Sequence, residues 1–289
     1  MSTPDAQRPA VRLGHRAVRA LGAALLSKVE RARIERLRAA LPQPEYDVFG
    51  MHPDWVGLVN AIVDLPYRYY FRVRSYGAEH IPARGPAILV ANHSGTLPFD
   101  ALMLCTDVPR QTEPPRLLRA ITDRFVSRLP WAGVGMSRIG AVSGALANVR
   151  HLLEHDQLIL IFPEGLSAIG KPHTERYRLQ PFHVGFAELA LRHRVPVIPV
   201  AIIGPEEQWP VLAQLHNLHP YGLPYVPVVS TLLPLPVRYH IHYGAPLVLH
   251  GLEQEPITQS SIEHASERTR RALQELIDRG VAERKSVFR

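Results

Sequence analysis

Short apolar runs alternate with amphipathic stretches from about residue 70 onward, and this alternation narrows the possible folds more than any other property of the chain. The runs Ile159–Phe162 and Val195–Ile203 contain no charged residue, as expected of strands that are buried on both faces of a sheet. Stretches with helical periodicity separate such runs. Strands that alternate with helices predict an α/β fold: a single mixed, mostly parallel sheet of about seven strands, with helices on both faces.

The individual elements are expected from the same patterns. Strands are predicted at Phe71–Tyr76, Ala87–Asn92, Arg116–Thr122, Ile139–Val142, Gln157–Phe162, Val195–Ile203 and Val237–Tyr243. Helices are predicted at Phe99–Thr106, Asp123–Leu129, Gly144–His155, Pro181–His193 and, on the surface, Ser261–Glu283. Residues 205–236 contain seven prolines, which exclude a regular helix or a central strand and predict an ordered loop or lid.

The N-terminal segment carries almost all of the net charge. Residues 1–40 hold nine Lys and Arg against three acids, so +6 of the formal net charge of +7 lies there. One amphipathic helix is expected over residues 10–40, and it either lies on an anionic membrane or packs on the protein with its basic face in solvent. Four apolar residues recur along it at helical spacing, namely Val18, Leu21, Leu25 and Val29. A second helix is expected from about Pro53 to Tyr67, which gives the chain an N-terminal amphipathic helical region.

The sequence also bears on location. No stretch reaches the roughly 18 apolar residues that a membrane-spanning helix needs, and arginines interrupt the segment where a secretory signal would have its apolar core. We therefore expect a cytoplasmic protein that is peripheral on a membrane surface. A mitochondrial transit peptide is a less favoured interpretation, because acids return by Glu30. The single cysteine, Cys105, fits a reducing compartment, and no nucleic-acid-binding motif accompanies the basic residues.

The stretch Ile88–Asp100 carries the strongest chemical signal. A buried strand ends in His93, at the sheet edge where open α/β folds bind ligands, and a Gly-containing turn leads to a helix with Asp100 in its first turn. A carboxylate that folds back onto the imidazole fixes its tautomer and raises its basicity, as a general base requires. Read alone, the same residues also describe a helix-capping Asp and an unrelated His. A second strand ends in the stiff turn Phe162–Gly165, which holds Glu164 at the same edge.

Taken together, these segments resemble the four motif blocks of the phospholipid/glycerol acyltransferase superfamily. The blocks are His93 with Asp100, the Gly-containing segment Arg138–Val142, the Phe-Pro-Glu-Gly turn and the proline-bracketed strand Val195–Gly204. The segment Gly244–Leu247 also matches the Gly-x-Pro-Leu that follows the last strand in that superfamily.

The resemblance implies a mechanism and a division of the chain. His93 would remove the proton of a lipid hydroxyl, Asp100 would orient it, and the alkoxide would attack an acyl thioester carried by coenzyme A or an acyl carrier protein. It implies no metal and no cofactor beyond that thioester. The expected regions are a membrane-associating part at 1–68, an acyltransferase domain at 69–255 and a C-terminal helix at 256–289.

Two departures from the superfamily pattern bear on the acceptor. Six residues separate His93 from Asp100 where the superfamily usually has four. The arginine that usually follows the third block is replaced by Leu166 and Ser167. The predicted acceptor-binding residues are Glu164, Gly165, Ser167, Lys171 and Arg178. The missing arginine favours a neutral hydroxyl acceptor, as in the diacylglycerol acyltransferase-like branch, over a lysophosphatidate.

Two other functions compete with this prediction. A catalytically silent lipid- or membrane-binding protein of the same fold would keep these blocks without activity. A zinc metallopeptidase would use His151 and His155, which match the pattern H-x-x-E-H on a predicted helix. The oligomeric state is left open.

Overall fold

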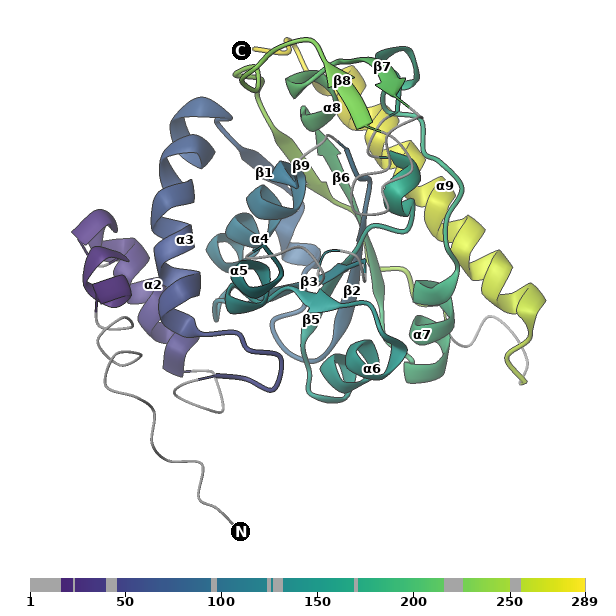
Figure 1. Ribbon diagram of the computed structural model, residues 1–289. Helices are drawn as coiled ribbons and strands as arrows, with labels where there is room; N and C mark the ends of the chain where they lie inside the picture. Colours follow the sequence, from purple (N-terminus) through teal and green to yellow (C-terminus); the bar gives the residue numbers. More distant parts are fainter. Residues whose placement is uncertain are drawn as a thin grey trace.

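The computed structural model describes residues 17–22, 24–39, 46–94, 98–123, 126, 132–168, 171–215, 226–249 and 256–288. Seven strands form one mixed sheet in the order β1-β9-β6-β2-β5-β3-β4 (Figure 1). Their bounds are β1 Arg74–Tyr76, β2 Ala87–Ala91, β3 Leu118–Thr122, β4 Val142–Ser143, β5 Leu158–Ile161, β6 Val197–Ile203 and β9 His240–Tyr243. The α/β fold with about seven strands is confirmed.

The sheet is mostly parallel, with one change of direction. Strands β6, β2, β5, β3 and β4 run parallel to one another. Strand β9 pairs antiparallel with β6, and β1 pairs parallel with β9 at the edge. The carboxyl ends of β6, β2 and β5 therefore lie side by side, which is the edge where the sequence places the candidate site.

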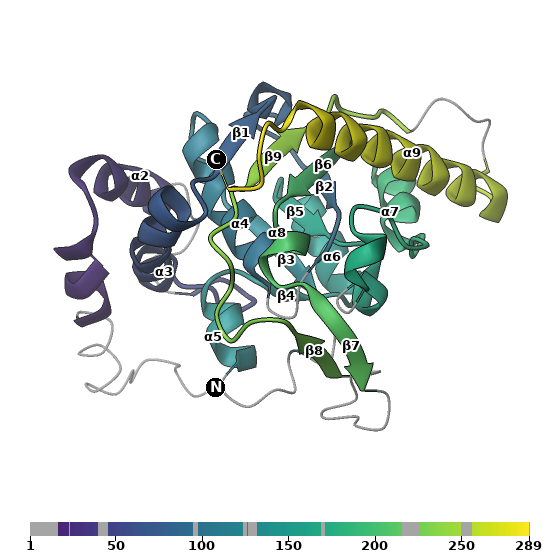
Figure 2. The same ribbon diagram turned by 90° about the horizontal axis from the view of Figure 1, so that it is seen from above.

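Helices cover both faces of the sheet (Figure 2). Helices α3 (Pro53–Leu65) and α4 (Phe99–Gln111) lie on one face, and α6 (Leu146–Glu154), α7 (Gly185–His193) and α9 (Gln259–Glu283) lie on the other. A hydrophobic core lies on each face of the sheet, and alternate residues of β2 pack into one core or the other, because successive side chains of a strand point to opposite faces. Ile88 and Val90 pack towards α7 and α9, whereas Leu89 packs towards α4.

Several predicted boundaries are wrong, each for a local reason. Strand β1 begins at Arg74 because the helix before it continues as a π-helical turn, Pro66–Tyr70. Strand β4 follows a helix, α5 (Ala132–Arg138), that the sequence analysis did not predict. Helix α7 begins at Gly185, four residues later than expected, and α4 runs on to Gln111. The predicted helix Asp123–Leu129 lies mostly outside the described residues.

The proline-rich segment contains more regular structure than predicted. It opens with a short helix, α8 (Pro205–Gln208), which Pro205 can start because the first residue of a helix needs no N–H donor. Strands β7 (Val211–Leu215) and β8 (Val226–Val229) then form a separate antiparallel pair outside the main sheet. The prolines are compatible with this pair because neither strand is central in a sheet. The expectation of no regular helix was therefore wrong, and the exclusion of a central strand was right.

The single N-terminal helix expected at 10–40 is interrupted. Residues 10–16 lie outside the described part, the helical residues described from 17 onward end at Leu25, and Leu26 lies in a bend. Helix α2 (Lys28–Ala39) then starts anew, because the Ser27 hydroxyl accepts a hydrogen bond from the Glu30 backbone N–H at 3.2 Å, as a helix N-cap does.

The predicted apolar stripe is not the buried face of this region. Leu21, Leu25 and Val29, the predicted apolar stripe, are 54%, 57% and 65% exposed, whereas Leu26 and Ile34 are buried. The buried positions Gly22, Leu26, Glu30 and Ile34 keep a spacing of four through the break, so the predicted stripe lies on the neighbouring, exposed face.

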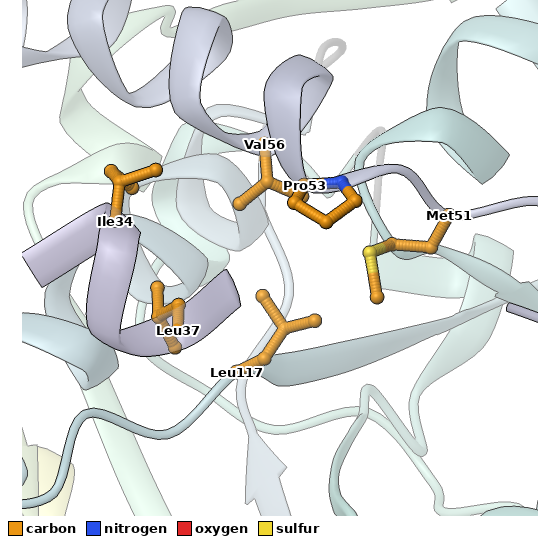
Figure 3. A pocket seen from close by; sticks show the side chains of 6 residues that line it. All are labelled: Ile34, Leu37, Met51, Pro53, Val56 and Leu117. Atoms are coloured by element: carbon orange, nitrogen blue, oxygen red, sulfur yellow. The ribbon is translucent and has the colours of Figure 1, made fainter. Parts of the chain in front are cut away.

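Helix α2 packs on α3 through apolar side chains and a buried charge cluster. Its Ile34 and Leu37 point towards Val56 of α3 and Leu117 ahead of β3, and the four side chains line a small apolar pocket (Figure 3). The Glu30 carboxylate is buried and lies 2.6–3.4 Å from the guanidinium groups of three arginines, Arg33, Arg68 and Arg110. The packed-helix interpretation therefore holds for α2.

The C-terminal helix is also more deeply integrated than expected. One face of α9 is buried against β6, and Gly280 lies at the closest approach. Among the described residues, no helix is both long and apolar enough to cross a membrane.

Candidate active site

The candidate site lies at the carboxyl ends of three adjacent strands. His93 follows β2, Glu164 follows β5, and the helix α8 follows β6. The side chain of Asn92 joins two of these strand ends, because its amide donates to the Ile202 carbonyl at 2.9 Å and accepts from the Ile202 N–H at 2.7 Å. This side chain continues the ladder between β2 and β6 by one residue and fixes the position of His93.

His93 and Asp100 meet despite the long turn between them. The His93 Nδ1 and the Asp100 Oδ2 are 2.6 Å apart. Asp100 lies in the first turn of α4, with Pro98 as the N-cap. The two side chains are therefore in contact, as expected. Residues 95–97 of the turn between them lie outside the described part.

Asp100 is fully buried and accepts three hydrogen bonds. Besides the imidazole, its Oδ2 accepts from the Ser94 N–H at 2.9 Å and its Oδ1 accepts from the Ala101 N–H at 2.7 Å. Because a carboxylate accepts and the imidazole donates from Nδ1, Nε2 is left as the nitrogen that can take a proton.

The electrostatic surroundings favour the protonated imidazole. Burial by itself would lower the pKa of His93, but the nearby carboxylates of Asp100 and Glu164 outweigh burial and raise the pKa. The ring of Phe162 stacks on the imidazole with centroids 4.3 Å apart, which limits its rotation. This arrangement has the features of an oriented general base.

Glu164 supports His93 from the neighbouring strand. Its Oε1 accepts from the His93 N–H at 3.1 Å and its Oε2 accepts from the Gln180 N–H at 2.7 Å. Burial raises the pKa of this carboxyl group, although both N–H donors and the Lys171 charge oppose that rise. The turn around it needs glycine, because Gly165 has φ 58° and an added Cβ would lie 3.3 Å from the His183 ring.

The other predicted acceptor-binding residues are placed less favourably. The Ser167 hydroxyl donates to the Glu164 carbonyl at 2.5 Å. The Lys171 ammonium lies 3.0 Å from the Glu206 carboxylate and donates to the Arg178 carbonyl at 2.8 Å. Arg178 itself is exposed, so the structure brings its backbone to Lys171 and not its guanidinium.

Glu206 was not predicted from the sequence, although it forms part of the site. It is the partner of Lys171, and burial raises its pKa to about 7 although the ammonium opposes this. Trp209 was also missed: its ring lies 5.8 Å from that of Phe99, the residue before Asp100. Neither has a local signal, because both come from the proline-rich segment, which only the tertiary fold brings to β2.

Of the two histidines of the zinc interpretation, His151 lies on α6 and His155 is the residue at its C-cap. Their rings are 3.9 Å apart, and the Nδ1 of His155 lies 2.7 Å from the His151 carbonyl of the same helix. Within the described ranges, no group of three or more His, Cys, Asp or Glu side chains is arranged to hold a metal ion.

Comparison with known proteins defines the family. The family model described as Acyltransferase matches residues 72–203, which include His93, Asp100 and the turn with Glu164. An uncharacterized protein of Mycobacterium tuberculosis is 33% identical over 254 residues, which cover 84% of this chain and 71% of that protein. The chain belongs to the acyltransferase family. The superfamily predicted from the four motif blocks is thus confirmed.

Two further proteins resemble this acyltransferase. A Bos taurus protein named DGAT1/2-independent enzyme synthesizing storage lipids is 24% identical over 208 residues, covering 71% of this chain and 58% of that protein. The crystal structure of the 1-acyl-sn-glycerophosphate (LPA) acyltransferase PlsC from Thermotoga maritima superimposes with a TM-score of 0.52 at 15% identity, covering 96% and 99% of the two chains. The structural match establishes a shared fold.

Proposed function

We propose that this acyltransferase moves a fatty acyl group from an acyl thioester to a glycerolipid-type or other lipid hydroxyl, with His93 as the general base. The observation that carries the proposal is the 2.6 Å contact between His93 Nδ1 and the buried Asp100 carboxylate. That contact leaves Nε2 as the proton acceptor, at the edge of the sheet where ligands bind in open α/β folds.

The proposed reaction proceeds in one acyl transfer. His93 Nε2 takes the proton of the acceptor hydroxyl while the hydroxyl oxygen forms a bond to the carbonyl carbon of the thioester. The tetrahedral intermediate then expels the thiolate as the carbon–sulfur bond breaks, and the imidazolium returns the proton to that sulfur. Asp100 stabilises the imidazolium between these two steps, as it does in other His–carboxylate pairs. The thioester, acyl-CoA or acyl carrier protein, is the co-substrate and no cofactor is needed.

Glu164 has a positioning role in this proposal. Both of its oxygens accept backbone N–H groups, so it holds the peptide of His93 and the loop at Gln180 in place. Gly165, Ser167 and Lys171 then shape the acceptor side of the site.

A neutral hydroxyl is the favoured acceptor. A phosphate group is normally held by arginine forks or several N–H donors. Lys171 is already paired with Glu206 at 3.0 Å, and Glu164 adds a second carboxylate near by. The name of the Bos taurus relative refers to storage lipids, whereas that of the Thermotoga maritima enzyme refers to lysophosphatidate. The charges around Lys171 favour the former.

The proposal places the protein on a membrane surface. Lipid acceptors reside there, and Leu21, Leu25 and Val29 are exposed beside a segment that carries +6 of charge. Apolar side chains next to basic ones are the combination that binds an anionic lipid surface.

The test is an acyl-transfer assay with purified protein. Oleoyl-CoA is supplied with monoacylglycerol, diacylglycerol, a long-chain alcohol or lysophosphatidate, and both ester product and released thiol are measured. His93→Ala is expected to lower turnover about a hundredfold or more without lowering the melting temperature by more than a few degrees. His151→Ala is the matched control on α6 and should leave the rate unchanged.

The assay distinguishes the competing functions. Ester formation that survives His93→Ala would refute the general-base mechanism. A wild-type protein that binds these lipids but forms no ester with either acyl-CoA or acyl carrier protein donors would instead identify a silent lipid-binding protein.

A further inference from the structure

A small pocket next to His93 has several polar groups in its walls, and some of them have no partner in the described structure. The carboxyl end of β2 and the loop around residues 171–176 form two of its sides, and the segment after β6 forms the third. Its lining includes Ser94, Lys171, His173, Glu206, Trp209 and Val211. The pocket therefore joins the base, the motif after β5 and the proline-rich segment.

Three buried polar atoms of this pocket have no hydrogen-bond partner in the described structure. They are the Ser94 hydroxyl, the His173 Nδ1 and the Trp209 Nε1. Ser94 is only 2% exposed. An unpaired buried polar atom costs about 1–3 kcal/mol, and such atoms are rare in folded proteins. Three in one pocket indicate that something outside the protein supplies their hydrogen bonds.

The pocket is connected to the base by short contacts. Ser94 follows His93 in the chain, and its N–H donates to the same Asp100 oxygen that receives His93 Nδ1. Trp209 packs edge-on against Phe99, the first residue of α4. The pocket is thus directly beside the His93–Asp100 pair.

The charges of the pocket favour an uncharged group. The ammonium of Lys171 is matched by Glu206 at 3.0 Å, and both are buried side chains. Arg176 lies at the rim, is exposed and donates to the His173 carbonyl at 3.3 Å. A phosphate at this depth would approach the carboxylate of Glu206, with Glu164 also close enough to act on it. Anions near buried carboxylates are destabilised.

We propose that Ser94, His173 and Trp209 bind a second, uncharged hydroxyl of the acceptor, so that the preferred acceptor is a vicinal diol such as a 1-monoacylglycerol. This inference rests on the proposed acyl transfer and names its acceptor class. The indole Nε1–H, which can only donate, binds the hydroxyl oxygen. The hydroxyl proton is donated to the Ser94 oxygen or to the His173 Nδ1. Such hydrogen bonds reject an acceptor that lacks the second hydroxyl, because the site's polar atoms are then left unpaired.

The first experiment measures binding without catalysis. In the ¹⁵N-labelled His93→Ala protein, the Trp209 indole signal is assigned by comparison with a sample that also carries Trp209→Phe. Titration with a short-chain monoacylglycerol is expected to shift this signal, and a monohydric alcohol of equal length is expected to leave it in place. Equal responses to both compounds, or a larger response to inorganic phosphate, would overturn the diol assignment.

The second experiment measures discrimination in the active enzyme. The ratio of kcat/KM for monoacylglycerol to that for a long-chain alcohol is expected to fall about tenfold in Trp209→Phe and in Ser94→Ala, the loss of one hydrogen bond each. Trp55→Phe, a tryptophan of α3 outside the pocket, is the matched control and should keep the wild-type ratio. Thermal unfolding of each variant shows that the fold is retained.

The outcomes separate the two proposals. A wild-type enzyme that esterifies both acceptors with an unchanged ratio in the variants would refute the diol pocket and leave acyl transfer intact. Failure to esterify these two acceptors, diacylglycerol or lysophosphatidate with either acyl-CoA or acyl carrier protein donors would refute the proposed function itself, while the indole shift with the diol would still establish the pocket.

Discussion

Replacing Asp100 with Asn tests the catalytic pair most directly. The carboxylate oxygen Oδ2 receives hydrogen bonds from both His93 Nδ1 and the Ser94 N–H, and Oδ1 receives one from the Ala101 N–H. An amide has one oxygen and one NH₂ group, so it cannot accept all three. With the NH₂ group towards His93, the amide would donate to Nδ1 and move the imidazole proton to Nε2, where it blocks the base.

The expected loss is large. A general base contributes about 10²–10⁴ to the rate, and an analogous Asp-to-Asn change in a serine protease triad costs about 10⁴ in kcat through the wrong tautomer. We expect Asp100→Asn to lower kcat by at least about 10²-fold. Thiol release from oleoyl-CoA, followed with monoacylglycerol as the acceptor, measures this loss.

The pH dependence gives a second and independent readout. The carboxylates of Asp100 and Glu164 raise the pKa of His93 above its ordinary value of 6.5. The base must be neutral, so the wild-type kcat/KM falls as pH drops through that raised pKa. Removing the charge of Asp100 removes a main cause of the rise, and the acid limb should move to lower pH.

The same pKa shift predicts how stability depends on pH. Because the folded-state pKa of His93 is raised, the imidazolium–carboxylate pair stabilises the fold fully below the unfolded-state pKa near 6.5. That contribution is lost as pH rises through the folded-state pKa. Asp100→Asn should reduce it, and the smaller effect of Glu164 should remain.

A buried carboxylate on the same helix provides the control. Asp107 is fully buried on α4 and accepts hydrogen bonds from the hydroxyls of Tyr67, Ser75 and Tyr243. Asp107→Asn should cost about 2–3 kcal/mol of stability, the range for hydrogen bonds to a charged group, and leave kcat unchanged. If Asp100→Asn keeps kcat within about threefold of wild type with the same acid limb, the assignment of the base is wrong.

Three further predictions concern stability and membrane binding. Gly280→Ala should destabilise the protein by about 1–3 kcal/mol in a denaturant titration, because the added Cβ would lie 2.4 Å from Ile203 Cδ1; an unchanged midpoint would show that α9 can shift freely. Burial lowers the pKa of His240 to about 4. Between about pH 6.5 and 4 the unfolded chain therefore binds a proton at this residue that the folded protein does not bind. The free energy of unfolding should fall by up to about 3 kcal/mol as the pH is lowered through this range. His240→Phe, which keeps a ring beside Tyr76, should remove most of that slope, and a slope that persists would assign it to another group. Changing Leu21, Leu25 and Val29 together to Gln should lower the affinity for anionic liposomes, measured by sedimentation, at least about tenfold. The control Leu146→Gln changes an equally exposed leucine of α6 and should have no effect. Equal sedimentation of both variants would argue against membrane contact through this stripe.

The sequence predicted those features that depend on local patterns. The apolar runs at β2, β5 and β6 identified the central strands, since only strands buried on both faces lack polar alternation. The position of His93 and Glu164 at strand ends followed from the same runs. The contact between His93 and Asp100 was expected from chemistry, although the turn between them was longer than usual.

What the sequence could not predict depends on phase or on distant contacts. The N-terminal stripe was misassigned because adjacent apolar residues, Leu25 and Leu26, face different sides of the helix, and only packing against the rest of the protein shows that Leu26 is the buried one. Glu206 and Trp209 reach the site only because β6 lies next to β2, and strand order is not written in any one segment. The unpaired atoms of Ser94 and His173 became visible only when the walls of the pocket were assembled.

The pairing of β1 with β9 constrains the order in which the domain is completed. In the described sheet β1 has β9 as its neighbour, with Arg74 opposite His240, so the first strand to be synthesised pairs with the last. Strands β2, β3, β5 and β6 leave the ribosome before β9 and can pair among themselves, but the edge beyond β6 stays open until residue 243 has emerged. A nascent chain stalled before that point presents an unpaired β1 and the bare flank of β6, the kind of exposed edge that chaperones bind and that aggregates recruit. Completion of the sheet therefore waits for β9, whereas the edge between β2 and β5, which carries His93 and Glu164, can form before the sheet is closed.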